Sequence, residues 1–324
     1  MNIDEIEVSP LAAESLGVRS LCTLIRTPDV SILFDPSAAL AKRYNLEPHP
    51  DEYLALQSSL ERIDLAIKEA DIISISHYHY DHVRPGFTNY LYNLSTQNER
   101  KQSLTGKVVF AKDNRENINS SQRRRAFFFQ KDIKSVVKEL QWVDDRKFVF
   151  GNTTITYSKP LPHGPVGSAL GYILTTTVEY LGTRILFAPD VQGPIVRDTL
   201  SYILSQEPSV ALIGGPPIYL SNFRKSELES ALYCLSNLAS TIPILVVDHH
   251  IMRDSKWDEW MRPILSVAEG SGNQTTTMAE LSGRENKCLE AHRIDLYESA
   301  PPSEEFLRWA QATEEYKIQN MPPL

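Results

Sequence analysis

The sequence of 324 residues predicts an α/β fold in a single domain. Short apolar segments typical of buried strands alternate along the chain with segments that repeat their apolar residues at helical spacing. Several of the strands end directly in His or Asp, whose side chains bind zinc, iron or manganese. No repeat of fixed period, linker or low-complexity stretch divides the chain, so we expect one domain over residues 1–324.

The composition is typical of a globular protein with a substantial core. Hydrophobic residues make up 42% of the chain and charged residues 23%, while the formal net charge of −8 argues against a general affinity for nucleic acid. No apolar run approaches the roughly 20 residues that cross a membrane, and the first residues lack the pattern of a signal peptide. The three cysteines, Cys22, Cys234 and Cys288, are far apart and suit reduced packing residues. We therefore expect a cytoplasmic protein with no membrane partner, and the sequence leaves the oligomeric state open.

Two strands and a helix precede the richest motif of the chain. Residues 21–25 and 31–34 are apolar and flank a turn, and the second strand ends at Asp35. A carboxylate at that place either caps a loop or orients a metal ligand from behind. Residues 51–69 carry apolar residues at helical spacing, which predicts a helix packed on the core. The strand predicted at 72–75 then leads into the motif.

Four side chains able to bind a metal lie close together in the segment Ser76–His82. Because His77 and His79 are two residues apart at a strand end, both can point the same way and chelate one ion. Asp81 and His82 then turn back over a second position. The alternative is a solvated loop rich in His. We disfavour it because the motif holds three of the chain's eight His.

Residues 83–141 are predicted to form a helical insertion after the motif. The segment includes a strand at 107–111 and a helix that begins near Asn117. This helix carries three consecutive arginines, Arg123, Arg124 and Arg125. Since consecutive residues point to different sides of a helix, a solvated face is the favoured interpretation. The alternative is a clamp at the helix N-terminus that binds the phosphate or carboxylate of a substrate.

The second half of the chain repeats the pattern of a strand followed by a polar residue. A hairpin at 147–157 leads to a loop with His163, and a hairpin at 171–188 leads to Asp190. A strand at 243–247 ends in Asp248, His249 and His250. Helices are predicted at 195–205, 224–239 and 254–268, with a helical C-terminal tail from about residue 303. Because strand ends at one edge of a sheet converge, we expect these polar side chains to meet the histidine motif.

A further strand at 210–213 ends in two glycines and two prolines. A rigid strand-to-helix turn is the favoured interpretation, since glycine frees the backbone and proline fixes it. The alternative is that the backbone of Gly214 and Gly215 approaches the substrate at the mouth of the site.

The order of these motifs resembles the metallo-β-lactamase fold superfamily from the first strands to about residue 250. The His-x-His-x-Asp-His signature, a single downstream His, a strand-terminal Asp and a late His carry the resemblance. More narrowly, the chain is similar to an uncharacterised archaeal group of predicted metal-dependent hydrolases. That similarity lies in Ser76–His82, Asn119-x-Ser121-Gln122, Gly214–Pro217 and Asp248–His250. The resemblance implies a four-layer αββα sandwich.

The resemblance also implies a site for two divalent metal ions, zinc being favoured, with iron or manganese as alternatives. The first ion would be held by His77, His79 and His163, and the second by Asp81, His82 and one late His, with Asp190 bridging the two. His249 is slightly preferred over His250 as the late ligand, and Asp35 and Asp248 would orient the ligands from behind. Antibiotic-hydrolysing β-lactamases commonly use a Cys at the second metal. No Cys lies near Asp190, which resembles the phosphodiesterase, glyoxalase and lactonase branches instead.

The chemistry implied is hydrolysis of an ester-type bond. Two ions bridged by a carboxylate lower the pKa of a bridging water, so that hydroxide exists at neutral pH. Asp81 would accept a proton from that water, and His249 or His250 would give one to the leaving group. The arginine segment favours a phosphodiester over a lactone or thioester, in a small-molecule or phosphoester substrate. The alternatives are a nuclease acting on RNA or DNA, which the net charge disfavours, and a non-catalytic protein stabilised by its metals.

Overall fold

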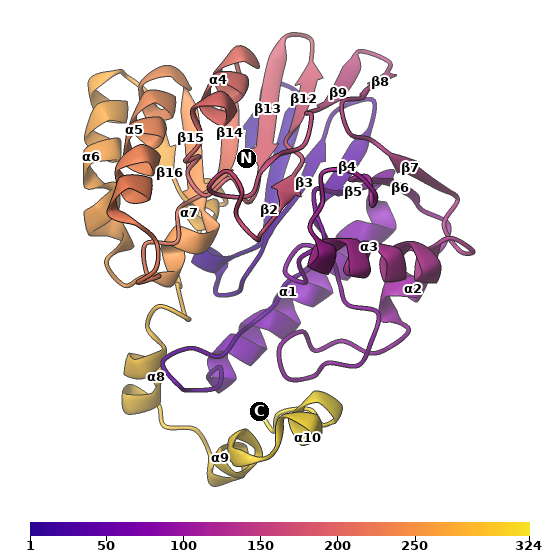
Figure 1. Ribbon diagram of the computed structural model, residues 1–324, viewed down its shortest axis with the longest axis vertical. Helices are drawn as coiled ribbons and strands as arrows, with labels where there is room; N and C mark the ends of the chain where they lie inside the picture. Colours follow the sequence, from indigo (N-terminus) through magenta and orange to yellow (C-terminus); the bar gives the residue numbers. More distant parts are fainter.

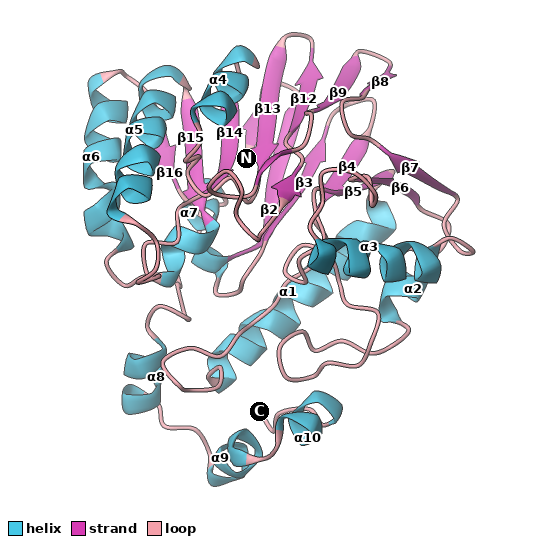
Figure 2. Cartoon of the chain, viewed as in Figure 1, coloured by secondary structure: helices cyan, strands magenta, loops and turns pink.

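Two sheets of seven strands each pack face to face, and helices cover both outer faces (Figure 1, Figure 2). A computed structural model describes residues 1–324. The first sheet has the strand order β1-β2-β3-β4-β5-β6-β7, and the second has the order β16-β15-β14-β13-β12-β9-β8. This arrangement confirms the predicted four-layer αββα sandwich.

The first sheet is antiparallel over its first four strands and parallel from β4 to β7. Its strands are β1 (Asn2–Ile3), β2 (Ile6–Ala13), β3 (Leu21–Arg26), β4 (Ser31–Phe34), β5 (Ile72–Ile75), β6 (Val108–Ala111) and β7 (Glu139–Trp142). The helices of this half are α1 (Pro50–Glu69), α2 (Glu99–Ser103) and α3 (Ser120–Ile133). Residues 83–141 therefore contribute two sheet strands, β6 and β7, as well as two helices. The second of these strands has no sequence signal, since its residues are only partly buried.

The second sheet combines a meander with a parallel half. Its strands are β8 (Lys147–Phe150), β9 (Thr153–Tyr157), β12 (Thr176–Tyr180), β13 (Thr183–Ala188), β14 (Val210–Gly214), β15 (Ile244–Asp248) and β16 (Gln274–Thr276). The helices on its outer face are α4 (Arg197–Ser205), α5 (Lys225–Thr241) and α6 (Trp257–Gly270). Strands β13 to β16 run parallel, so their carboxyl ends meet at one edge.

One predicted hairpin is wrong in its first strand. The partner of β13 is β12 rather than a strand at 171–176, because Leu181 and Gly182 form a tight turn with positive φ (47° and 94°) between them. The preceding residues instead form the short β11 (Tyr172–Ile173), which pairs with β10 (Leu161–Pro162). This small ribbon holds the loop that carries His163.

Aromatic pairs fill the space between the sheets. Phe34 and Phe187 stack across it with ring centroids 4.9 Å apart, and Phe110 stacks on Phe148 at 4.3 Å. Outside the first sheet, α1 buries Leu56 and Ile63. Since each sheet is buried on both faces over much of its area, its central strands are almost wholly apolar.

The C-terminal helices return to the first half of the chain (Figure 1). They follow α7 (Met278–Leu281) and are α8 (Arg293–Ser299), α9 (Glu304–Gln311) and α10 (Glu314–Gln319). Phe306 and Trp309 of α9 pack their rings against Tyr53 of α1, at 6.1 and 5.7 Å between centroids. None of the helices is both long enough and apolar enough to span a lipid bilayer.

Candidate metal centre

The predicted metal-binding side chains come from four loops and meet where the two sheets end. The histidine motif follows β5 of the first sheet, whereas Asp190 follows β13 of the second. His163 lies between β10 and β11, and His249 and His250 follow β15. The strand-end convergence expected from the sequence is therefore present.

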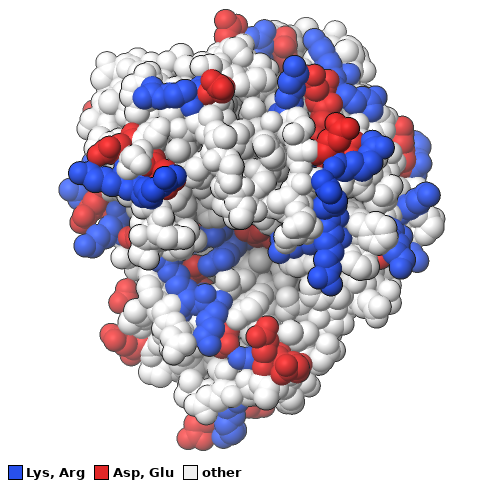
Figure 3. Space-filling view, in the orientation of Figure 1, with Lys and Arg blue, Asp and Glu red and all other residues white.

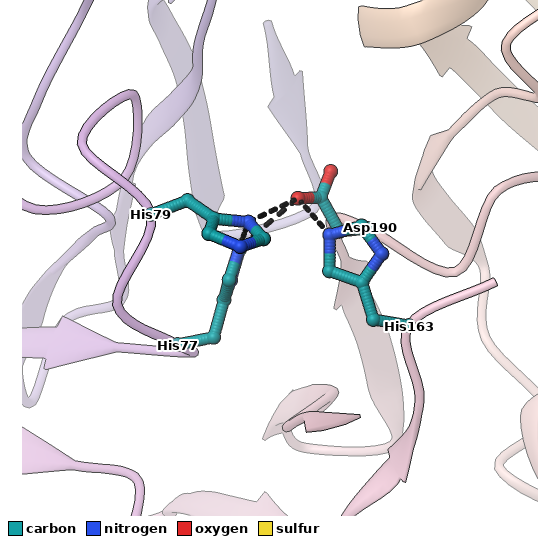
Figure 4. Close-up of side chains that lie close together, drawn as sticks. All are labelled: His77, His79, His163 and Asp190. Carbon is teal, nitrogen blue, oxygen red and sulfur yellow. Dashed lines mark hydrogen bonds and ion pairs between the residues drawn. The ribbon is translucent and has the colours of Figure 1, made fainter. Parts of the chain in front are cut away.

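One group of side chains surrounds a single oxygen of Asp190 (Figure 4). The Asp190 Oδ2 atom lies 3.0 Å from His77 Nε2, 2.8 Å from His163 Nε2 and 3.8 Å from His79 Nδ1. The three rings point toward one another, and His77 Nε2 and His79 Nδ1 are only 3.0 Å apart. These four side chains form the first candidate metal position.

A second group lies on the other side of the same carboxylate. His249 Nε2 is 2.8 Å from Asp190 Oδ1 and 3.2 Å from His82 Nε2. Asp81 Oδ2 is 3.8 Å from His249 Nε2 and 4.0 Å from His82 Nε2. Asp81, His82 and His249 therefore form a second candidate position, with Asp190 between it and the first.

The buried nitrogens of these groups suit a bound cation. Two imidazole nitrogens about 3 Å apart can share only one proton, and neither ring nitrogen of His163 or His250 makes a hydrogen bond. Buried polar atoms in proteins are nearly always hydrogen-bonded, so unpartnered nitrogens around a carboxylate fit the ligands of a metal. The donor set of imidazole and carboxylate suits zinc, iron or manganese.

Asp35 orients two of the metal-facing histidines. Its carboxylate accepts hydrogen bonds from His82 Nδ1 (2.9 Å), from the Ser76 backbone N–H (2.8 Å) and from Ser76 Oγ (2.6 Å). Ser76 Oγ in turn lies 2.9 Å from His77 Nδ1. Because His82 donates its Nδ1–H to Asp35, the Nε2 atom stays free to face the second position. This is the orienting role that the sequence left open.

Glu14 orients His249 in the same way, a role that no sequence motif indicates. Its Oε2 atom lies 2.8 Å from His249 Nδ1, and its Oε1 atom accepts from Arg253 Nε at 2.6 Å. Arg253 also lies 3.6 Å from Asp81 Oδ2. Glu14 and Arg253 are buried and separated by 239 positions, so no local motif connects them.

Asp248 supports the backbone rather than a histidine ring. Its carboxylate accepts from the backbone N–H groups of Ser15 (3.1 Å), His249 (2.7 Å) and Met278 (3.0 Å). Burial, followed by the charge of Glu14, raises the pKa of Asp248 to about 6. Its contribution to the site is to fix the loop on which the two late histidines lie.

Both late histidines face Asp190. His250 Nε2 lies 3.3 Å from Asp190 Oδ1, beside the closer His249. The backbone of His249 is left-handed (φ 65°), a conformation that residues other than glycine rarely adopt. Such strain persists where surrounding contacts enforce it, here the bonds from Asp248 and Glu14.

The pKa values of the site favour neutral histidines at the first candidate position and an ionised carboxylate on Asp190. Burial lowers the pKa of His77 and His79, and burial together with Arg253 lowers the pKa of His250 to about 3, so these rings are neutral. Burial also lowers the pKa of His249, but Glu14 and Asp190 outweigh it and raise that pKa to about 9. Burial raises the pKa of Asp190, but the charges of His249 and His82 outweigh it and hold that pKa well below its usual value.

The two glycines after β14 have a packing role. A Cβ atom at Gly214 would overlap the carbonyl oxygen of Pro189, directly before Asp190. At Gly215 it would lie 2.5 Å from Ile251 Cγ2 and 3.2 Å from the carbonyl oxygen of Asp248. Both glycines are buried and allow the loops that carry the metal-facing residues to approach closely. This geometry supports the rigid-turn interpretation of the pair.

Asn119 and Gln122, at the start of α3, form hydrogen bonds to two of the loops that carry the candidate metal ligands. Asn119 caps the helix by accepting from the Gln122 backbone N–H (2.7 Å), and its side chain donates to the carbonyl of Ala169 (2.7 Å). The buried Gln122 side chain accepts from the Tyr78 backbone N–H (3.3 Å) and donates to the carbonyl of Leu170 (2.6 Å). The loop of His163 and the histidine motif are thereby joined through one helix end.

The three arginines of α3 have different surroundings. Arg123 donates to the carbonyl of Arg115 (3.0 Å), while Arg124 and Arg125 line a cavity next to Tyr80. Lys and Arg side chains gather beside a hollow near the middle of the molecular face, on the side where α3 lies (Figure 3). The metal-facing side chains that reach the surface are His79, Asp81 and His250, at 21%, 17% and 12% side-chain exposure, so the centre opens on their side.

Comparison with known proteins connects this geometry to a family. The family model described as the Metallo-beta-lactamase superfamily matches residues 16–84, a range that ends just after the histidine motif. A UPF0282 protein of Methanopyrus kandleri is 40% identical over 294 residues, covering 90% of this chain and 99% of that protein. A UPF0282 protein of Pyrococcus abyssi is 39% identical over 295 residues, covering 90% of this chain and 92% of that protein.

Among solved structures, a more distant likeness concerns the fold alone. CmlA, a diiron β-hydroxylase from Streptomyces venezuelae, superposes with a TM-score of 0.50 at 10% sequence identity. The match covers 85% of this chain and 53% of that chain, so this protein spans about half the length of CmlA.

Proposed function

This chain belongs to the UPF0282 family and has the metallo-β-lactamase fold, and from that premise we propose that it is a hydrolase with two metal ions, acting on a phosphodiester. The observation that carries the proposal is the position of Asp190. One of its oxygens faces His77 and His163 at 3.0 and 2.8 Å, and the other faces His249 at 2.8 Å. His82 Nε2 lies 3.4 Å from the first of these oxygens, so the carboxylate lies between the two groups of histidines and suits a bridge between two ions.

Two divalent ions, with zinc favoured, would supply a water ionised at neutral pH and positive charge for the developing oxyanion. His77, His79 and His163 would hold one ion, and Asp81, His82 and His249 the other. The chain's own part is to keep these groups fixed. Asp35 and Glu14 hold the Nδ1 atoms of His82 and His249, so both rings present Nε2. Asp81 is ionised, because nearby histidine charges depress its pKa against the effect of burial, and it can accept a proton from water.

We assign the contact with the leaving group to His250. His249 has a carboxylate at each ring nitrogen, so neither is free to reach a substrate. The nitrogens of His250 make no hydrogen bond, and the ring is partly exposed. With a pKa of about 3 the His250 ring is neutral at pH 7. It therefore donates a hydrogen bond to the leaving group through its one N–H.

A phosphodiester is favoured over a lactone or thioester by the two arginines of α3 near the metal loop. Guanidinium groups bind phosphate oxygens through paired hydrogen bonds, and a neutral lactone offers no matching charge.

A cytoplasmic location fits the three cysteines, which are buried and unpaired, since thiols stay reduced in that compartment.

The experiment is a substrate panel with the purified, metal-loaded protein. We expect turnover of bis(p-nitrophenyl) phosphate and its loss in Asp190→Ala, whereas Asp258→Ala, an exposed aspartate of α6, retains it. Turnover of lactones alone would reject the phosphodiester assignment, and turnover of no ester in protein with full metal content would reject the hydrolase.

A further inference from the structure

A cavity of about 620 Å³ lies between Tyr80 of the histidine motif and α3. Its wall includes Tyr80, whose neighbours in the chain are the metal-facing residues His79 and Asp81. Arg125 from α3 also touches the motif, because its Nη1 atom donates to the carbonyl of Tyr78 at 3.4 Å. The histidine motif therefore contributes to the cavity wall through Tyr80 and holds Arg125 through the Tyr78 carbonyl. Cavities of this size hold a drug-sized ligand.

Two guanidinium groups in this cavity lack a carboxylate partner. Arg124 and Arg125 line the wall, and no Asp or Glu lies within ion-pair distance of either. Arg100, in the same wall, is different, since it forms an ion pair with Asp132. The cavity thus carries two uncompensated positive charges, which favour an anion with several oxygens.

Aromatic rings form a further part of the cavity wall. Tyr80 and Phe87 meet edge to face with centroids 5.4 Å apart, and the Arg125 guanidinium lies 4.6 Å from the Tyr80 ring centre. Phe87 and Phe128 also line the cavity and are 43% and 45% exposed. Large aromatic residues with exposed faces inside a cavity are suited to stack on a flat ligand.

We propose that this cavity binds one nucleotide unit of the substrate, with its phosphate on Arg124 and Arg125 and its base against the aromatic rings. The inference rests on the proposed function, because it places the nucleotide next to the phosphodiester that the metal centre cleaves. Paired guanidinium–phosphate contacts combined with base stacking are the chemistry by which proteins hold unpaired nucleotides. A sugar phosphate lacks the flat ring, and an acyl chain lacks the charge.

Calorimetric titration of the metal-loaded, full-length protein with adenosine 5′-monophosphate tests the proposal. Ribose 5-phosphate, which lacks the base, is expected to bind at least about tenfold more weakly, as one lost stacking contact predicts. Phe128→Ala and Arg124→Gln are each expected to weaken nucleotide binding by about tenfold. Both side chains are on the exposed side of α3, so neither change removes a core contact.

Another residue of the same helix provides a matched control. Arg123→Gln removes an exposed side chain that does not line the cavity, so nucleotide affinity should stay unchanged. Equal binding of adenosine 5′-monophosphate and ribose 5-phosphate would overturn the proposal. So would Phe128→Ala and Arg124→Gln variants that bind the nucleotide as tightly as the wild type.

Longer ligands identify the source of the nucleotide. If a single-stranded decanucleotide binds no more tightly than a dinucleotide, the ligand is a small molecule or a strand end. If affinity rises with length and falls steeply with salt, it is a polynucleotide. Either result keeps the cavity as the nucleotide site.

The two proposals can fail separately. Hydrolysis of bis(p-nitrophenyl) phosphate without nucleotide binding would reject the cavity and leave the hydrolase intact. Nucleotide binding that depends on Phe128 and Arg124 without any hydrolysis would reject the hydrolase and leave the cavity.

Discussion

Two buried carboxylates, Asp35 and Glu14, decide which nitrogen of the histidines faces the centre. Each accepts a hydrogen bond from Nδ1 of one ring, His82 or His249, and leaves its Nε2 atom toward Asp190. Groups in this position typically change metal affinity by 10–100-fold when they are removed. Metal affinity should therefore depend on residues that touch no metal.

Glu14→Gln is expected to weaken binding of the second ion by roughly tenfold. An amide cannot stabilise the His249 ring as a carboxylate does, and Arg253 loses its ionic partner. Competition with a chromophoric chelator measures the change, with the exposed Glu269→Gln as the control. Unchanged affinity for both ions would show that Glu14 has no orienting role.

Gly214→Ala is expected to destabilise the fold by about 1–3 kcal/mol and to reduce metal content, because the new methyl group displaces Pro189 and with it Asp190. Thermal unfolding together with metal analysis measures both effects. Gly270→Ala is a suitable control, since nothing lies within 4 Å of a Cβ at that position. A stable Gly214→Ala variant with full metal content would refute the packing role.

At this scale the sequence identified the side chains that meet but not the groups behind them. His77, His79, Asp81, His82, His163 and Asp190 all follow strands or a loop in a recognisable order, and the structure brings them together. The sequence favoured His249 over His250 only slightly, because the difference depends on Glu14, which is 235 positions away.

Helix α9, near the C-terminus, packs against α1. Phe306 and Trp309 are buried against Tyr53, although they belong to a segment far from it in the chain. Lys317 of α10 is also buried and donates to Glu47 at 2.6 Å. The tail is therefore part of the core on the α1 side, away from the metal centre.

Trp309→Ala should lower the free energy of unfolding by about 3–5 kcal/mol, the usual cost of removing a buried aromatic side chain. Metal content should stay at the wild-type value, because α9 does not contact the metal-binding loops. Chemical denaturation and metal analysis test this pair of expectations, with the more exposed Leu307→Ala of the same helix as the control. Loss of metal in folded Trp309→Ala would contradict this separation.

Elements with a regular apolar pattern were predictable, and elements fixed by distant partners were not. The sequence predicted α1, β4, β5, β14 and β15 because these segments are apolar or amphipathic by themselves. No strand was predicted at β2, where polar and apolar residues alternate around Pro10. The predicted hairpin partner of β13 was also the wrong segment. Both depend on a partner strand that only the folded sheet provides.

Across the whole molecule, buried ion pairs connect the ends of the chain. Arg19 binds Glu290 through two hydrogen bonds of 2.6 Å, and Arg293 binds Glu52 through two of 2.8 Å. Burial raises the pKa of Glu290, but Arg19 and Arg253 outweigh it and lower that pKa to about 2. Because the folded-state pKa is depressed, this carboxylate stabilises the fold fully above about pH 4.5. The stabilisation is lost as the pH falls toward 2.

Glu290→Gln should make stability less sensitive to acid. Between pH 7 and pH 3 the wild type is expected to lose about 2 kcal/mol more unfolding free energy than the variant, because about 1.5 pH units lie between the ordinary pKa of 4.5 and pH 3. Denaturant unfolding at the two pH values gives the difference. Identical acid sensitivity of both proteins would mean that the Arg19–Glu290 pair does not carry this linkage.

The measurement that tests the central claim most directly is the metal content of the purified protein, determined by elemental mass spectrometry. We expect two divalent ions per chain, reduced in Asp190→Ala, because both candidate positions share that carboxylate. Removal of the ions by a chelator should lower the unfolding temperature. Fewer than one ion per chain, with stability unchanged by the chelator, would contradict the two-metal centre and the hydrolase proposed from it.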